Sequence, residues 1–193
     1  MHCTGILLAA GRGRRFDPTG LQNKLLHPLP DGERVALRAA RQLAAALAST
    51  LVVVHPDADG LIALLEHAGF RTTRCPDAAA GMGHSLAHGL RETDGAPGWI
   101  IALADMPHVQ CDTIMALDRA IRDGADIAVP VHQARRGNPV GFSRRHRQAL
   151  MQMHGDRGAR DLLRAFPVTE VEVEDPAIFF DIDTPHDLDP IRS

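Results

Sequence analysis

The sequence predicts an α/β fold in which a mostly parallel β-sheet is covered by helices on both faces. Short apolar runs alternate along the chain with stretches whose apolar residues recur at helical spacing. This β-α-β-α order is typical of parallel sheets. A chain of 193 residues suits a domain with a full hydrophobic core. No repeat, low-complexity linker or shift in composition marks a boundary, so we expect one three-layer domain over residues 1–193.

The first two thirds of the chain show the alternation most clearly. Residues 4–8 are apolar enough for a buried strand, and residues 35–48 indicate a helix because their apolar positions cluster on one face. The same reasoning, taken in chain order, predicts strands at 50–54, 70–74, 99–103 and 127–131, and helices at 60–68, 83–91 and 112–122.

The last third of the chain departs from this rhythm. We expect a strand at 140–142, helices at 144–153 and 159–164, and a short strand at 178–181. Residues 168–173 alternate between apolar and polar side chains, which is typical of a half-exposed edge strand.

Composition and charge exclude several classes of function. The formal net charge of -3 argues against a nucleic-acid partner. No apolar run approaches the ~18 residues that a membrane span requires, and no basic region precedes an apolar core at the start of the chain, as it would in a signal peptide. The three cysteines are far apart, which fits reduced thiols. We therefore expect a cytoplasmic protein without a membrane partner.

An arginine-rich glycine loop follows the first expected strand. Its sequence is Leu7-Leu8-Ala9-Ala10-Gly11-Arg12-Gly13-Arg14-Arg15-Phe16. Ligands of open α/β sheets bind beyond the carboxyl ends of the strands, and glycines allow backbone N–H groups to surround a phosphate. The spacing matches neither a P-loop nor a complete dinucleotide fingerprint, since Phe16 stands where a third glycine is needed. By itself the loop is explained equally well as a phosphate site or as a plain turn.

Five short blocks carry a family resemblance. They are Leu-Ala-Ala-Gly-x-Gly-x-Arg at 8–15 with Asn23-Lys24-Leu25-Leu26, then Gly81-Met82-Gly83-His84-Ser85-Leu86, Leu103-Ala104-Asp105-Met106-Pro107, Arg136-Gly137-Asn138-Pro139-Val140 and Asp181-Ile182-Asp183-Thr184-Pro185. Together they resemble the MobA-like nucleotidyltransferase superfamily, and most of all its molybdenum cofactor cytidylyltransferases. The resemblance implies a Rossmann-like nucleotidyltransferase fold. Phe16-Asp17-Pro18 departs from the Met-Gly usual in the family.

Two carboxylates are candidates for a metal site. Asp105 follows the apolar run at 99–103, so it should lie just beyond the carboxyl end of a strand, and Asp183 follows another apolar run. Mg²⁺ accepts hard oxygen ligands from one or two carboxylates. The resemblance assigns Asp105 and Asp183 to Mg²⁺, whereas a purely structural role would have each cap a turn. Asp181 competes with Asp183 for the second position, and the motif match favours Asp183.

The resemblance also distributes the remaining roles. It places Lys24, Asp105 and Arg15 in catalysis, and it implies that the nucleotide is bound by Leu8, Ala9, Ala10, Gly11, Arg12, Gly13, Lys24, Gly81 and Ser85. Lys24 is the single lysine among 21 basic residues. It is either a chance survivor of an arginine bias or a compact charge that a phosphate requires.

Two further groups of residues are candidates for recognising the base and the acceptor. Ser85 is placed to read a base edge or to cap a helix. Ala10 stands where guanylyl-transferring relatives tend to carry glycine, which favours CTP. The turn formed by Arg136, Gly137, Asn138 and Pro139, with Arg135 beside it, is a candidate for binding an anionic acceptor, as is the polar loop at 155–160. Arginines at these positions are explained equally well as solvated surface charge.

The predicted reaction is transfer of CMP from CTP to a molybdopterin-type cofactor, with release of pyrophosphate. The alternatives are a relative that uses GTP, one that acts on a sugar or polyol phosphate, and a non-catalytic chaperone of the molybdenum cofactor. Contact with a molybdoenzyme or its chaperone fits the expected product. A nicotinamide-dependent dehydrogenase is disfavoured because the third glycine is missing.

Overall fold

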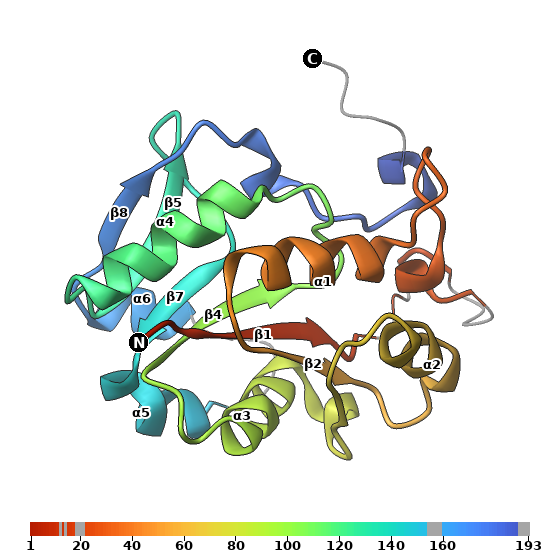
Figure 1. Cartoon of the computed structure of the whole chain (residues 1–193), viewed down its shortest axis with the longest axis horizontal. Coiled ribbons are helices and arrows are strands. Elements are labelled where there is room, and N and C mark those ends of the chain that lie inside the picture. Colours follow the sequence, from red (N-terminus) through yellow and green to blue (C-terminus); the bar gives the residue numbers. More distant parts are fainter. Residues whose placement is uncertain (12, 14, 18–21, 154–159, 189–193) are drawn as a thin grey trace.

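A twisted sheet forms the centre of the molecule (Figure 1). The computed structural model describes residues 1–11, 13, 15–17, 22–153 and 160–188. Within those residues the sheet has eight strands in the order β3-β2-β1-β4-β7-β5-β6, and β8 pairs with β5. The strands are β1 Thr4–Ala9, β2 Thr50–Val54, β3 Thr72–Arg74, β4 Gly98–Leu103, β5 Ile127–His132, β6 Arg135–Arg136, β7 Val140–Ser143 and β8 Thr169–Glu172.

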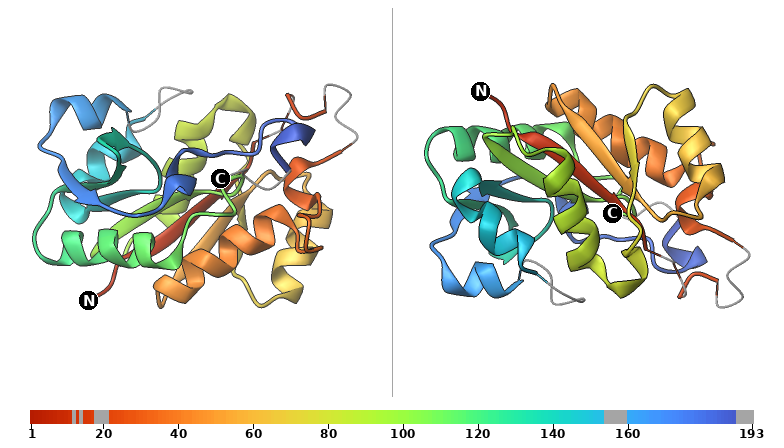
Figure 2. Two further views of the ribbon diagram at one scale, coloured as in Figure 1. Left: turned by 90° about the horizontal axis from the view of Figure 1, so that it is seen from above. Right: turned by 90° about the horizontal axis from the view of Figure 1, so that it is seen from below.

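Helices cover both faces of the sheet, as the two views in Figure 2 show. The helices are α1 Val35–Ala46, α2 Asp59–His67, α3 Met82–Glu92, α4 Cys111–Arg122, α5 Arg147–Met151 and α6 Arg160–Ala165. Residues from α1, α2 and α4 share one hydrophobic cluster with one side of the sheet, and residues from α3 and α5 share a second cluster with the other side. The predicted three-layer α/β architecture is confirmed.

Strand β1 shows how the sequence produces this arrangement. All six of its residues are buried, with Leu7 and Ala9 in the first cluster and Ile6 and Leu8 in the second. A strand that is apolar on both faces can be stable only between two layers of helices. It pairs in parallel with β2 and β4, which encloses it in the sheet.

The C-terminal third corrects two expectations. The strand expected at 178–181 is wrong: Pro176–Phe179 is a 3-10 helix, whose start is capped by Asp175 accepting a hydrogen bond from the Ala177 N–H. The fixed φ of Pro176 suits the first residue of a helix. The apolar run at 178–180 alone does not indicate that a helix starts before it. The helix expected at 144–153 is shorter, because a 3-10 turn at Arg144–His146 precedes α5. The edge strand at the end of the sheet is confirmed as β8.

Strand pairing brings the first and third sequence blocks together. Leu8 of β1 lies opposite Leu103 of β4 in a parallel register, and the Ala104 N–H donates to the Leu8 carbonyl oxygen at 3.1 Å. The glycine loop and Asp105 therefore leave the sheet at the same edge, beyond the carboxyl ends of neighbouring strands. No helix in the described part of the chain is long and apolar enough to cross a membrane.

The start of β1 is tied to α4 through a buried carboxylate. Asp118 accepts hydrogen bonds from the Cys3 N–H and the His2 ring at 2.8 Å and from Arg122 at 3.0 Å. Desolvation raises the pKa of Asp118, but these hydrogen bonds outweigh it and the net pKa falls below its usual value. A carboxyl whose pKa is lowered by folding stabilises the fold above its unfolded pKa and loses that contribution as pH falls through the folded value.

We therefore expect Asp118→Asn to lower the free energy of unfolding by about 1–3 kcal/mol at neutral pH, the usual effect of an unsatisfied buried group. The difference from wild type should shrink in acid, where the wild-type carboxyl is itself protonated. Denaturant melts at several pH values measure it, with Asp112→Asn on the exposed face of the same helix as the control. A difference in the free energy of unfolding that stays the same at all pH values would contradict the lowered pKa of Asp118.

Candidate active site

A cavity of about 500 Å³ opens at the edge of the sheet where β1 and β4 end. Its lining includes all of the described residues that the sequence analysis assigned to the nucleotide, to the metal or to catalysis. They are Leu8, Ala9, Ala10, Gly11, Gly13, Arg15, Lys24, Gly81, Ser85, Asp105 and Asp183. Arg12 lies outside the described residues. The size of the cavity is within the range usual for small-molecule sites.

The glycine loop is shaped by its second glycine. Gly13 has a φ of +59°, a conformation that residues with a side chain rarely adopt. A β-carbon at this position would also lie 3.3 Å from Cγ of Lys24. Gly13 therefore turns the loop and leaves room for the lysine stem beside it.

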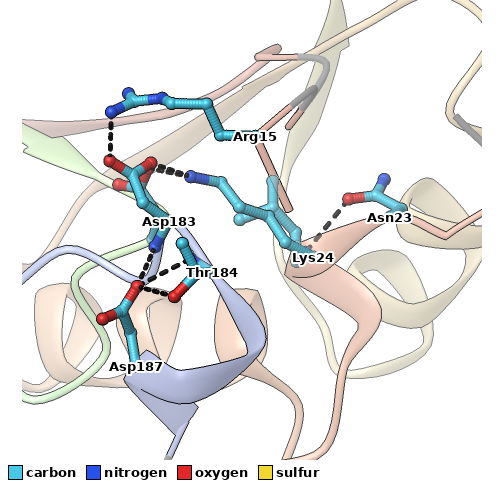
Figure 3. A network of polar contacts seen from close by, with 8 residues as sticks. Arg15, Asn23, Lys24, Asp183, Thr184 and Asp187 are labelled. Carbon is cyan, nitrogen blue, oxygen red and sulfur yellow. Dashed lines mark hydrogen bonds and ion pairs between the residues drawn. The ribbon is translucent and has the colours of Figure 1, made fainter. Parts of the chain in front are cut away.

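Lys24 is buried and contacts two of the acidic residues (Figure 3). It begins a 3-10 turn, Lys24–Leu26, which Asn23 caps by accepting a hydrogen bond from the Leu25 N–H at 3.0 Å. The Lys24 ammonium donates to Asp105 Oδ2 at 2.6 Å and to Asp183 Oδ1 at 3.2 Å. Arg15, whose side chain is exposed, pairs with the other oxygen of Asp183 at 2.6 Å. Two cations thus balance part of the acidic charge.

Three carboxylates, rather than the two expected, converge here. One oxygen each from Asp105, Asp181 and Asp183 lies within 4.8 Å of the others, and this is the group of possible metal ligands found among the described residues. Partial desolvation raises the pKa of Asp181, and the charges of Asp183 and Asp105 raise it further. Repulsion of this kind is relieved when a divalent cation binds, so the donor set fits a hard metal ion.

Local backbone contacts hold the segment that carries Asp181 and Asp183. The Ile182 N–H donates to the Asp105 carbonyl oxygen at 2.8 Å, which links the segment directly to the end of β4. Asp187, which sequence reasoning did not single out, accepts from the backbone N–H groups of Asp183 and Thr184 at 3.1 and 2.6 Å. The Thr184 hydroxyl also donates to Asp187 at 2.8 Å, and this bond first, followed by those from the backbone N–H groups, lowers the pKa of Asp187. An aspartate three residues after a threonine was the signal for this cap.

The second block opens α3 at the wall of the cavity. The helix begins at Met82 with Gly81 as its N-cap, one residue earlier than expected. Ser85 lies inside the helix, is 4% exposed and lines the cavity. The alternative that Ser85 caps the helix is therefore wrong, and its hydroxyl remains a candidate for base recognition.

The fourth block does not line this cavity. Arg136 pairs with Glu170 at 2.6 Å, and the Arg135 guanidinium lies 4.3 Å from the centre of the Phe179 ring. Gly137 and Asn138 contact the chain at Ile178 instead. Acceptor binding by residues 136–139 stays a prediction, and most of the loop at 155–160 lies outside the described residues.

An acidic cavity at the carboxyl edge of a mostly parallel sheet characterises this α/β protein, and comparisons with known proteins give its family. The model of the MobA-like NTP transferase domain matches residues 5–172. The chain belongs to the MobA-like NTP transferase family and is a nucleotidyltransferase of that family.

Named relatives cover nearly the whole chain. Purine catabolism protein PucB of Bacillus subtilis is 32% identical over 99% of this chain and 96% of its own length. A molybdenum cofactor guanylyltransferase of Burkholderia ambifaria is 30% identical, covering 96% and 93%. A nicotine blue oxidoreductase of Paenarthrobacter nicotinovorans is 28% identical, covering 94% and 92%.

A solved structure is similar over the same extent. Rv0371c of Mycobacterium tuberculosis has a TM-score of 0.82 at 28% identity, covering 97% of this chain and 95% of its own. A structure of Rv0371c in complex with manganese has a TM-score of 0.78 at 27% identity, covering 97% and 96%.

Proposed function

We propose that this nucleotidyltransferase transfers CMP from CTP to a molybdopterin-type cofactor, with Mg²⁺ as the metal and pyrophosphate as the leaving group. One observation carries the catalytic part of the proposal. Lys24 and three carboxylates meet at the mouth of the glycine loop, where a triphosphate would lie. The sequence relation to molybdenum cofactor guanylyltransferases supports the acceptor.

The residues present fit a divalent metal ion. Asp105, Asp181 and Asp183 would hold it, and a metal bound there neutralises charge on phosphate oxygens. The observed contact of Lys24 with Asp105 and Asp183 keeps the acidic group partly neutralised before substrate binds. When the triphosphate is present, the flexible lysine stem allows the ammonium to turn toward the phosphates. The N–H groups of the glycine loop would orient them.

No strong general base is needed for the proposed transfer. An oxygen of the acceptor phosphate is already ionised and attacks the α-phosphorus of the nucleotide. The bond from the α-phosphorus to the bridging oxygen breaks as the new phosphoanhydride forms, and pyrophosphate leaves with the electron pair. The protein contributes position and electrostatic stabilisation, which are the main terms in such transfers.

The base preference is the first testable part. Ala10 and Ser85 are both buried and line the cavity. We expect kcat/KM for CTP to exceed that for GTP at least about tenfold, since small steric differences in a pocket are typically worth about 1–3 kcal/mol. The measurement is pyrophosphate release from each of four nucleoside triphosphates with Mg²⁺ and purified molybdenum cofactor. Ala10→Gly should narrow the preference, and equal or better use of GTP by wild type would reject the cytidylyl assignment.

The same assay separates the alternatives. Turnover with a sugar or polyol phosphate in place of the molybdenum cofactor would identify another acceptor. Tight binding of the cofactor without pyrophosphate release would indicate a chaperone. The similarity to a nicotine blue oxidoreductase leaves an oxidoreductase as a rival function. Oxidation of a reduced nicotinamide cofactor in the absence of any nucleoside triphosphate would identify it. A single domain over residues 1–193 and a cytoplasmic location remain predictions.

A further inference from the structure

The fourth sequence block, at 136–140, contacts the segment at 176–183 that carries Asp181 and Asp183. The Asn138 N–H donates to the Ile178 carbonyl oxygen at 3.0 Å, and the Gly137 N–H donates to the Pro130 carbonyl oxygen of β5 at 3.0 Å. These two bonds join the sheet to the 3-10 helix at Pro176–Phe179, which ends two residues before Asp181. The contact is made by backbone groups.

Gly137 has no room for a side chain at this contact. A β-carbon there would lie 2.5 Å from the Ile178 carbonyl oxygen and 2.6 and 2.7 Å from Cγ1 and Cβ of Ile178. Real β-carbons do not approach so closely, and the nearest atom is backbone, so any larger residue must push the segment away. The backbones touch at the point where the segment turns toward the cavity.

The segment is therefore held on both sides of Asp181. Ile178 is bonded to the Gly137–Asn138 turn, and Ile182 is bonded to the carbonyl oxygen of Asp105. Asp181 lies between these two attachments and Asp183 directly follows the second. A displacement at Ile178 changes the separation of the carboxylates, and Mg²⁺ tolerates little departure from ligand distances of about 2.0–2.1 Å.

We infer that the backbone of Gly137 and Asn138 positions Asp181 and Asp183 for the metal. Gly137 and Asn138 are then positioning residues rather than ligands of the acceptor. This inference rests on the metal site of the proposed function. It gives the turn a role that its side chains do not show.

The test is a titration of the full chain with Mn²⁺ in the absence of nucleotide, with binding monitored by electron paramagnetic resonance. Gly137→Ala should raise the Kd for Mn²⁺ at least about tenfold, because supporting contacts behind metal ligands typically change affinity 10–100-fold. Gly98→Ala is the matched control. Its β-carbon would lie 2.8 Å from the Phe142 carbonyl oxygen, at the other end of β4 from Asp105. It should lower Tm and leave the Kd for Mn²⁺ unchanged.

A second pair of variants isolates the hydrogen bond and serves if Gly137→Ala does not fold. Asn138→Pro removes the N–H, whereas Asn138→Ala keeps it and removes only the side-chain amide. Residues before a proline favour extended backbone, which proline itself also adopts. Asn138→Pro should weaken Mn²⁺ binding as Gly137→Ala does, and Asn138→Ala should not.

Three results would overturn the inference: unchanged Mn²⁺ affinity in Gly137→Ala and Asn138→Pro, equal loss in Gly98→Ala, or equal loss in Asn138→Ala. Failure of the wild type to bind Mn²⁺ would instead reject the metal-dependent function on which the inference depends. Recovery of turnover in Gly137→Ala at high Mn²⁺ would support positioning, because the ligands themselves are intact.

Discussion

Asp105→Asn is expected to lower turnover by roughly 10²–10³-fold, the scale of losing one preorganised electrostatic contact. The substitution keeps the shape of the side chain and removes the charge that both Lys24 and a metal require. Asp105 also holds the centre of the site, since its carbonyl oxygen binds Ile182 and its carboxylate binds Lys24. Asp183→Asn should act similarly. Pyrophosphate release measured over a range of Mg²⁺ concentrations checks the effect.

The control for this prediction is Asp57→Asn, whose side chain is 86% exposed and lies outside the site. It should retain wild-type turnover and the same dependence on Mg²⁺. Asp105→Asn should also require more Mg²⁺ for its residual activity. A fully active Asp105→Asn variant would reject the proposed mechanism.

Lys24→Arg is expected to be nearly as damaging as Lys24→Met, although it preserves the charge. Each should cost on the order of 2–4 kcal/mol in transition-state stabilisation. The structure supplies the reason, because the Lys24 side chain is 9% exposed and its ammonium sits within hydrogen-bond distance of two carboxylates. Gly13 closes on the lysine stem. A guanidinium is broader and planar, so it does not fit where a compact ammonium does.

The readouts for Lys24 are kcat/KM for the triphosphate and Tm with and without Mg²⁺. Lys24→Met should lower Tm without metal, because Asp105 and Asp183 lose a shared counter-charge, and Mg²⁺ should restore it. Arg15→Met, which removes an exposed cation from Asp183, should have the smaller effect on both quantities. Wild-type activity in Lys24→Arg would mean that any positive charge suffices.

Local patterns in the sequence were sufficient to predict many of the residues at the edge of the sheet where β1 and β4 end. The apolar run before Asp105 places it at the end of a strand, and the glycine loop follows β1 for the same reason. Since parallel strands end at one edge, their adjacency follows once β1 and β4 pair. The resemblance then placed Lys24 and Asp183 in the same site, and the cavity contains both.

Asp181 shows where the motif match was too narrow. It was weighed against Asp183 as a competitor, and the structure brings both oxygens toward Asp105. Side chains two residues apart point the same way when the backbone is extended, so the choice between them was unnecessary. Whether both side chains reach Asp105 depends on the path of the segment. That path is fixed by the hydrogen bonds of Ile182 to the Asp105 carbonyl oxygen and of Ile178 to the Asn138 N–H.

The layered fold and the glycine loop could be predicted from the sequence, because periodicity and turn residues act over a few neighbours, and the family motifs added the acidic and basic candidates. Which of these groups touch depends on the tertiary structure. Lys24 meets Asp105 across 81 positions and Asp183 across 159, and the turn at Gly137 packs against Ile178 instead of lining the cavity. Such contacts depend on strand order and on the close approach of distant backbones, which no local pattern records.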